Sequence, residues 1–332
     1  MADMQKSPEL IAPVIRPVAE PRMIDPAYSA EQVEALFGAI RRYGPIRHIL
    51  QLYVNRDSES ETGKLPDPTF RGELASEGVC FDPAAEPAFY NSRFLAAARA
   101  YRGSAYAAPR QLAFNATAPC AGPGPIHVDA PAFRGLWHVN THPTLLALIG
   151  QSGLFADFSV KMVQITAWFW RGAYGGFTYW PEGPQAQPRH VPPSWNRAIL
   201  AENQKMFHAP DSTLSPGEQG GLPGVTYSST FCPDPEDDDG WMVRAGDNVL
   251  ARYACAEVRW MVHWSCILFD DLADANRYFD RTDDLTIERV LDTFDRDMRG
   301  KGLRLLMTPE TAADPIALEQ LRRIYGAVMP QR

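Results

Sequence analysis

The sequence Pro125-Ile126-His127-Val128-Asp129 places an imidazole and a carboxylate two residues apart, directly after a turn rich in glycine and proline. Pro131 follows and prevents a helix from running back through Asp129, so an extended backbone is expected. On an extended strand, residues i and i+2 point to the same face, and both side chains can then reach one metal ion. His127 and Asp129 are therefore predicted as metal ligands. The simpler interpretation is a histidine at a strand end beside an aspartate that caps a turn.

The residues around this stretch favour strands. Residues 160–170 (VKMVQITAWFW) are rich in β-branched and aromatic side chains, which predicts a long buried strand. Further strands are expected at 48–54, 110–117, 175–184, 196–201, 248–253 and 258–269. Polar segments punctuated by glycine and proline predict long loops at 55–83, which is a candidate lid, and at about 209–240.

Helices are predicted on either side of these strands. Ser29 has the character of an N-cap, and Gly44-Pro45 ends the helix that follows it. The other helices are expected at about 86–102, 144–149, 271–279, 285–298 and 315–327. A β-rich centre with helices before and after it predicts an α+β fold, with a β-barrel or sandwich supported by N- and C-terminal helices.

The chain is expected to divide into four parts. Residues 1–27 are a proline-rich arm, and 28–110 form a lead-in of helices and strands that packs on the core. Residues 111–270 are the core that carries the site, with an inserted loop at about 209–240, and 271–332 are the C-terminal helices.

Composition narrows the possible partners. A net charge of −8 over 332 residues argues against a nucleic-acid surface, which needs clustered lysine and arginine to neutralise phosphates. No run of 18 or more apolar residues is present, so no membrane span is expected. The five cysteines are scattered without a Cys-x-x-Cys pair, which is typical of a reducing cytoplasm. A small-molecule substrate is the expected partner.

A metal site with two histidines and one carboxylate needs a second imidazole. His208 follows a strand and a polar turn that return the chain toward the end of the barrel, and it is the predicted ligand. His263 is the competing ligand, although it alternates with apolar neighbours as a core or pocket-wall histidine does. His138 and His142 have the spacing of a zinc-binding helix, but Pro143 follows directly and no glutamate completes the motif.

The order of these motifs resembles the non-haem Fe(II)/2-oxoglutarate-dependent oxygenase superfamily, and is nearest to its phytanoyl-CoA-hydroxylase-like branches. The resemblance covers roughly residues 110–270: His127-x-Asp129, the segment GGFTYWPEGP, Phe207-His208, and a final strand that contains an arginine. It implies a double-stranded β-helix (jelly-roll) core. It also implies that His127, Asp129 and His208 bind Fe(II), with 2-oxoglutarate as cosubstrate and O2 as the oxidant.

The same resemblance implies that Arg259 binds the distal carboxylate of 2-oxoglutarate. A guanidinium is suited to this role because it pairs bidentately with carboxylates and stays charged when partly buried. Arg259 lies 51 residues after His208, much further than is usual in the family, and an inserted loop would explain the gap. Arg252 is an alternative anchor for that carboxylate. If His263 is the second histidine ligand, the next arginine along the chain is Arg277. In the other interpretation, Arg259 is an ordinary strand arginine that does not bind the cosubstrate.

The implied function is hydroxylation, desaturation or cyclisation of a small organic molecule by hydrogen abstraction. Halogenating relatives have glycine or alanine in place of Asp129, so halogenation is disfavoured. Tyr179, Trp180, His263 and Trp264 are the residues predicted to line the substrate pocket. The alternatives are a cupin-like metal-dependent hydrolase or isomerase and a non-catalytic jelly-roll binding protein.

Overall fold

The computed structural model describes residues 15–49, 51 and 67–331 of the chain, and within them two antiparallel sheets face each other. The larger sheet has eleven strands, and the smaller has three. In order across the larger sheet, the strands are β1 (Arg22–Ile24), β9 (Trp195–Ala201), β6 (Met162–Phe169), β14 (Arg259–Phe269), β5 (Tyr106–Thr117), β3 (Thr69–Ser76), β2 (Ile46–His48), β11 (Thr230–Pro233), β12 (Gly240–Ala245) and β13 (Asn248–Ala254), with β4 (Val79–Cys80) beside β3. The smaller sheet contains β10 (Phe207–Pro210), β7 (Phe177–Trp180) and β8 (Arg189–Val191).

From β5 onward, the chain passes back and forth between the two sheets. It leaves β5 in the larger sheet, pairs with β10 through a single bridge at His127, and returns as β6. It then forms β7 and β8 in the smaller sheet, β9 in the larger, β10 in the smaller, and finally β14 in the larger. This alternation is the winding of a double-stranded β-helix, so the predicted β-rich α+β fold with a jelly-roll core is confirmed.

The helices are α1 (Ala30–Arg42), α3 (Glu86–Phe89), α4 (Ser92–Arg102), α5 (Pro143–Ser152), α6 (Leu272–Asp280), α7 (Ile287–Gly300) and α8 (Pro315–Tyr325). Short 3₁₀ turns lie at η1 (Pro83–Ala85), η2 (Ala156–Phe158), η3 (Asn203–Lys205), η4 (Cys255–Glu257) and η5 (Pro309–Thr311). Ser29 caps α1 in a capping box, as the sequence predicted, and Asp314 caps α8 ahead of Pro315. The predicted helix at 86–102 is broken, because α3 ends at Phe89 and a new helix, α4, begins after its N-cap Asn91.

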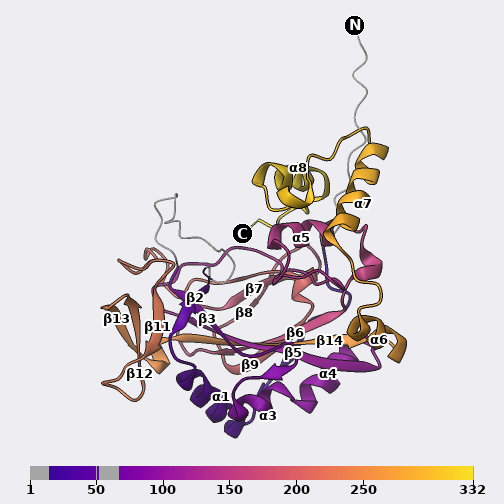
Figure 1. The fold of residues 1–332 in the computed structure, drawn as a ribbon. Coiled ribbons are helices and arrows are strands. Elements are labelled where there is room, and N and C mark those ends of the chain that lie inside the picture. Colours follow the sequence, from indigo (N-terminus) through magenta and orange to yellow (C-terminus); the bar gives the residue numbers. More distant parts are fainter. Residues whose placement is uncertain (1–14, 50, 52–66, 332) are drawn as a thin grey trace.

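The larger sheet buries one face against helices and turns the other toward the smaller sheet. Figure 1 shows α1, α3 and α4 along one side of the strands. On β6, Val163, Ile165 and Phe169 join the apolar core formed with these helices. The alternate residues Gln164, Thr166 and Trp168 point the other way, because side chains alternate along a strand. The second face of this sheet is therefore free to line a cavity.

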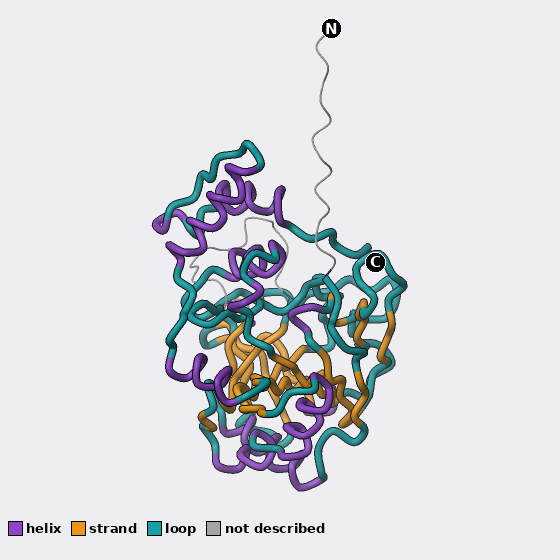
Figure 2. The backbone as a smooth tube through the Cα atoms, turned by 90° about the vertical axis from the view of Figure 1, so that its right-hand side faces the viewer, coloured by secondary structure: helices purple, strands orange, loops and turns teal. Residues whose placement is uncertain are grey.

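A separate apolar core holds the helices at the opposite end of the molecule. It is formed by α5, α7 and α8, with Leu145, Leu291 and Leu321 among its buried members. Figure 2 shows this helical group as a layer apart from the strands. Within this layer α5 lies next to the sheets, and its residues Pro143 and Ala147 contribute to the cavity wall.

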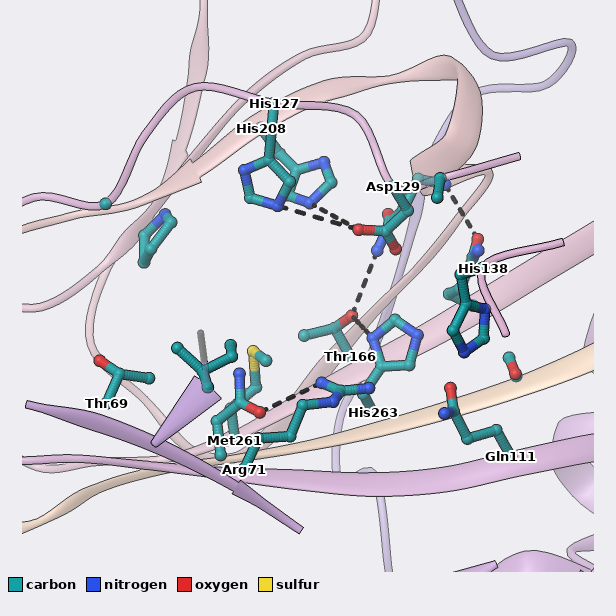
Figure 3. A pocket seen from close by; sticks show the side chains of 18 of the residues that line it. Thr69, Arg71, Gln111, His127, Asp129, His138, Thr166, His208, Met261 and His263 are labelled. Atoms are coloured by element: carbon teal, nitrogen blue, oxygen red, sulfur yellow. Dashed lines mark hydrogen bonds and ion pairs between the residues drawn. The ribbon is translucent and has the colours of Figure 1, made fainter. Parts of the chain in front are cut away.

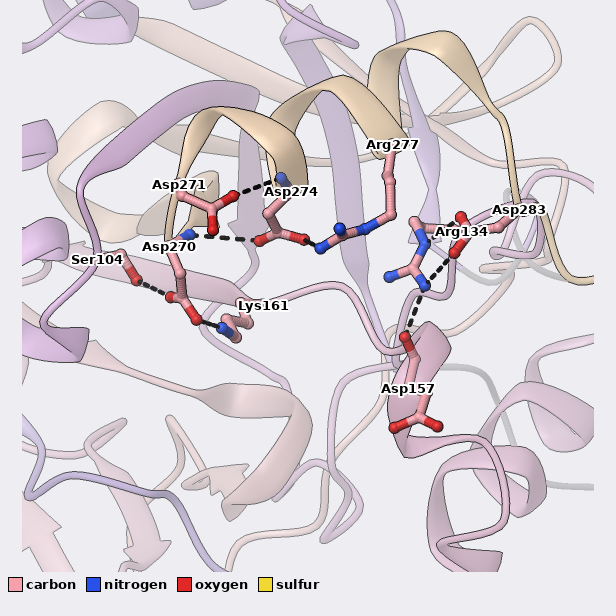
Figure 4. Close-up of polar contacts among 9 residues, drawn as sticks. All are labelled: Ser104, Arg134, Asp157, Lys161, Asp270, Asp271, Asp274, Arg277 and Asp283. Atoms are coloured by element: carbon pink, nitrogen blue, oxygen red, sulfur yellow. Dashed lines mark hydrogen bonds and ion pairs between the residues drawn. The ribbon is translucent and has the colours of Figure 1, made fainter.

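Polar contacts connect α6 and the segment after it to the strands (Figure 4). Asp270 pairs with Lys161 and accepts a hydrogen bond from Ser104, while Asp271 caps α6. Arg134 donates to both carboxylate oxygens of Asp283, at 2.7 and 2.8 Å. These contacts fix the point at which the chain leaves β14 for the C-terminal helices.

Two predicted loops contain strands. The segment 55–83 was expected to be a loop, but β3 and β4 lie within it, and its residues 55–66 fall outside the described part. In β3 the polar residues Thr69, Arg71 and Glu73 alternate with buried residues, and β5 pairs with the strand from Thr69 to Ala75. The predicted loop at 209–240 is wrong in the same way, since it contains β11 and leads into β12. Phe231 and Trp241 of these strands stack at 5.2 Å and pack on Trp260.

The predicted position of the strand at 48–54 is also wrong. It begins earlier, as β2 at Ile46, and ends at His48, after which Ile49 and Gln51 are helical. Residues 50 and 52–54 lie outside the described part of the chain. Within residues 15–49, 51 and 67–331, none of the helices combines the length and the hydropathy that crossing a membrane requires.

Candidate metal and cosubstrate site

His127 and His208 lie directly opposite each other in an antiparallel bridge. The backbone N–H of His127 donates to the His208 carbonyl at 3.0 Å, and the reciprocal bond is 2.9 Å. Directly paired residues place their side chains on the same face, and the two imidazole centroids are 4.4 Å apart. Asp129 is two residues beyond His127 on the same face, and its N–H donates to the Asn203 carbonyl. The spacing read from the sequence therefore brings all three side chains together.

Each imidazole is held in one orientation by its own backbone. The Nδ1 of His127 donates to the Pro125 carbonyl at 2.9 Å, and the Nδ1 of His208 donates to the Met206 carbonyl at 2.8 Å. A neutral imidazole that donates from Nδ1 presents an unprotonated Nε2. Both Nε2 atoms face Oδ1 of Asp129, at 3.8 Å from His127 and 3.5 Å from His208.

These three groups offer two nitrogen donors and one oxygen donor within 4.8 Å of one another. Hydrogen bonds from Nδ1 to backbone carbonyls are the usual support of metal-binding histidines, because they fix the tautomer and aim the lone pair. Two imidazoles and a carboxylate form the donor set of non-haem iron sites. The residues present thus fit a divalent metal such as Fe(II).

The charges of the site favour the ionisation states that a metal needs. Burial alone raises the pKa of Asp129, but the interactions with His208, and the charges of His263 and His127, outweigh it and hold the pKa well below its usual value. Burial, together with the charge of His208, lowers the pKa of His127 to about 4. At neutral pH the carboxylate is charged and the His127 imidazole is neutral.

The three groups open onto a cavity of about 1160 Å³ between the two sheets (Figure 3). Its floor is the free face of the larger sheet, to which β14 contributes Arg259, Met261, His263 and Ser265. Phe177 of β7 forms part of the opposite wall and lies 5.5 Å from the His208 ring. A cavity of this size has room for a cosubstrate and a second small molecule.

Arg259 lies at the start of β14 and is buried, with only 4% of its surface exposed. Its Nε donates to the Gly175 carbonyl at 2.8 Å, and its Nη2 donates to the Gly176 carbonyl at 3.1 Å. Burial lowers the pKa of Arg259 to about 10, so the guanidinium stays charged at neutral pH. Among the described residues no carboxylate lies within ion-pair distance of it, although the charge of Asp211 acts on it from nearby, so its guanidinium can bind an anion in the cavity.

The 51-residue gap between His208 and Arg259 has a structural explanation. Strands β11, β12 and β13 are inserted between β10 and β14, and they extend the larger sheet beyond β2. The insertion therefore leaves the start of β14 at the cavity. The alternative anchors lie elsewhere: Arg252 is on β13 and pairs with Asp234 and Glu236, and Arg277 is on α6 and pairs with Asp274 (Figure 4).

His263 lies on the cavity floor below the two predicted histidine ligands. Its Nδ1 is 3.5 Å from Oγ1 of Thr166, and it is not part of the group of donor atoms around Asp129. Burial is the main cause that lowers its pKa to about 4. His138 and His142 do not share a helix, because His142 is the N-cap of α5 and His138 lies in the preceding turn.

The three aromatic residues that the sequence predicted in the pocket wall do not line the cavity. Tyr179 packs with Trp168 and Val191 between the sheets, away from the open cavity. Trp180 is fully buried, and Trp264 is directed to the helical side, where its Nε1 donates to the Phe89 carbonyl. Of the predicted pocket residues, His263 lines the cavity, whereas Tyr179, Trp180 and Trp264 do not.

The sequence interpretation missed the polar residues that β3 and β5 contribute to the floor, such as Arg71 and Asn115. The signal that would have found them is the alternation of polar and apolar residues from Thr69 to Leu74, which is the pattern of a strand with one buried face.

The buried neutral state of His263 predicts a pH dependence of stability. Its pKa in the folded protein is below that of an unfolded chain, so the folded state binds fewer protons and stability falls as the pH drops from about 6.5 toward 4. For metal-free protein in a chelator, unfolding free energies from urea titrations are expected to fall between pH 7 and pH 5 by about 1–2 kcal/mol more in wild type than in His263→Gln. An equal fall in both proteins would contradict this assignment.

Comparisons with known proteins find similarity in structure but not in sequence. No family model matches the chain, and no curated protein does. A 2OG-Fe(II) oxygenase family oxidoreductase from Burkholderia pseudomallei is 10% identical with a TM-score of 0.40, over 75% of this chain and 87% of that one. HygX from Streptomyces hygroscopicus, solved with nickel, 2-oxoglutarate and hygromycin B, is 9% identical with a TM-score of 0.40, over 75% of this chain and 83% of that one.

A prolyl-4-hydroxylase from Pseudomonas putida is 11% identical with a TM-score of 0.37, over 74% of this chain and 92% of that one. At such low identities and TM-scores, the assignment of function depends on the geometry of the site. The resemblance to phytanoyl-CoA-hydroxylase-like branches stays a prediction.

Proposed function

We propose that this chain is an Fe(II)- and 2-oxoglutarate-dependent oxygenase that acts on a small organic molecule. The observation that carries the proposal is that His127, Asp129 and His208 converge on one point of a cavity whose floor also presents a buried arginine without an ion-pair partner among the described residues. The three donors suit Fe(II), and the arginine suits the distal carboxylate of the cosubstrate.

Each residue has a distinct role in this proposal. His127 and His208 provide Nε2 lone pairs, and Asp129 provides a carboxylate whose charge balances part of the charge of the metal. Arg259 orients 2-oxoglutarate, because the carbonyls of Gly175 and Gly176 hold its guanidinium in place. When bound, iron and 2-oxoglutarate supply the oxidative chemistry that activates O2 for hydrogen abstraction from the substrate.

The floor and walls of the cavity determine how the substrate is held. The site lies between the two sheets, where His208 is buried while the side chains of His127 and Asp129 keep 43% and 28% of their surface exposed. Hydroxylation, desaturation and cyclisation all fit a site that retains the carboxylate of Asp129. Halogenation is disfavoured because it replaces that ligand by a halide.

The proposal is tested by anaerobic titration of the wild-type protein with Fe(II) and then 2-oxoglutarate. A weak visible charge-transfer band is expected to appear at one equivalent of each, and not with Fe(II) alone. His142→Ala is the matched control, because His142 is exposed and lies outside the donor group, and it should give the same band.

The other outcomes separate the alternative functions. Tight metal binding without any spectral or affinity response to 2-oxoglutarate would contradict the oxygenase and favour a metal-dependent hydrolase or isomerase. Absence of stoichiometric metal binding would favour a non-catalytic binding protein.

A further inference from the structure

The cavity floor carries a second arginine that the proposed metal and cosubstrate site does not use. Arg71 lies on β3, and the strand register places it directly opposite Asn115 of β5, which in turn is opposite Met261 of β14. Directly paired residues share a face of the sheet, so these side chains form one row across the floor. In Figure 3, Arg71 points into the cavity beside His263.

The guanidinium of Arg71 has the capacity to bind an anion. Its Nη1 donates to the Asn115 Oδ1 at 3.1 Å, and within the described residues no carboxylate lies within 4.0 Å of it. Arg110, another arginine of the cavity wall, is already neutralised, because it pairs with Glu77 and stacks on Trp137 at 3.9 Å. A half-buried cation held by a neutral amide is expected to favour a negatively charged ligand.

Among the described residues, no nearby carboxylate forms an ion pair with Arg71. Glu73 is two residues from Arg71 on the same strand face and keeps its negative charge, but its Oε1 is held by Gln111 at 2.6 Å and it forms no ion pair with Arg71. Asp129 belongs to the group of metal-binding donors. The charge of Arg71 is therefore available to a molecule in the cavity.

Arg71 and Arg259 serve different parts of the cavity. Their strands are separated by β5, and they lie in adjacent rows of the floor, so their Cα atoms are on the order of 12 Å apart. Backbone carbonyls of Gly175 and Gly176 hold the Arg259 guanidinium at one end. Arg71 is instead close enough to His263 and His138 for its charge to lower the pKa of both.

We propose that Arg71, positioned by Asn115, binds a carboxylate of the primary substrate while Arg259 binds the cosubstrate. The inference depends on the proposed function, because it assigns the second molecule in the same cavity. The substrate is then a small organic acid whose apolar body lies along apolar residues of the cavity such as Met261 on the floor and Phe177 on the opposite wall. A planar carboxylate matches the two parallel donors that a guanidinium offers.

The test uses paired probes that differ only in charge: 4-phenylbutanoate with 4-phenylbutanamide, and hexanoate with hexanamide. Each is titrated anaerobically into the Co(II)-substituted protein saturated with 2-oxoglutarate, and binding is followed by the change in the visible Co(II) spectrum. In wild type, at least one acid is expected to bind about 30-fold more tightly than its amide. In Arg71→Gln that preference is expected to fall below about 3-fold.

Two controls isolate the role of Arg71. Arg252→Gln makes the same charge change on β13, at a residue that pairs with Asp234 and Glu236 and does not line the cavity, and should keep the preference for acids. The affinity of Arg71→Gln for 2-oxoglutarate should stay within about 3-fold of wild type. Circular dichroism and thermal unfolding establish that each variant is folded.

The possible results separate the two proposals. Equal binding of acids and amides to wild type, or no binding of any probe, would overturn the assignment of Arg71 while leaving the 2-oxoglutarate response intact. Loss of 2-oxoglutarate binding in Arg71→Gln to the extent expected for Arg259→Gln would also overturn it. Failure of the proposed function would instead appear as a wild-type protein whose metal spectrum does not respond to 2-oxoglutarate.

Discussion

Replacement of His208 by alanine is expected to weaken Fe(II) binding by at least about 100-fold and to abolish the 2-oxoglutarate-dependent band. The reason is that His208 provides one of two imidazole donors, and the bridge to His127 places no other histidine at that position. The measurement is an anaerobic metal titration with and without 2-oxoglutarate. His127→Ala and Asp129→Ala are expected to behave in the same way.

His263→Ala is the control that distinguishes the two possible ligand sets. His263 lies on the floor of the cavity and is not among the converging donors, so its variant should bind Fe(II) within about 3-fold of wild type. If His208→Ala keeps the band and His263→Ala loses it, the ligand assignment made here is wrong and His263 is the second imidazole.

Replacement of Arg259 by glutamine is expected to raise the dissociation constant for 2-oxoglutarate by about 30- to 1000-fold. Loss of a buried, charge-assisted partner costs this much because the distal carboxylate of the cosubstrate would then lie without a compensating charge at the Gly175 end of the cavity. Fe(II) affinity should change by less than about 3-fold, because Arg259 contributes no donor atom to the metal. Titration of the metal and of 2-oxoglutarate in the same variant measures both effects.

Arg252→Gln is the matched control for Arg259. Arg252 is on β13, pairs with Asp234 and Glu236, and does not line the cavity. Its replacement should leave the affinity for 2-oxoglutarate unchanged. Equal affinity of Arg259→Gln and wild type for 2-oxoglutarate would remove Arg259 from the site and leave Arg71 as the charged residue to test.

Much of the fold could be predicted because its signals are local in the chain. The cap at Ser29 and the Asp314-Pro315 start of α8 each depend on a few neighbouring residues. The strand at 160–170 was evident from its composition, and β6 occupies most of it. His127 and Asp129 were likewise placed on one face by the two-residue repeat of an extended chain.

Other elements were missed because they depend on partners far away in the sequence. Strand β3 lies in a segment punctuated by polar residues, proline and glycine, and it is stabilised by pairing with β5 and by burial of Phe70 in the core. Strands β11 and β12 lie in an acidic, proline-rich segment, where Phe231 and Trp241 pack on Trp260. Only the assembled sheet shows that these segments are extended.

By itself, the sequence determined the class of fold and predicted His127 and Asp129 as candidate ligands, with His208 as the preferred second histidine and His263 as the competitor left open. These conclusions needed only the alternation of side chains along a strand and the order of elements. The tertiary structure decided which side chains share the cavity. In the structure Arg71 lines the cavity, whereas Tyr179, Trp180 and Trp264 do not. The sequence could not show this, because long-range pairing sets the strand register and decides which face of each strand packs on the helices.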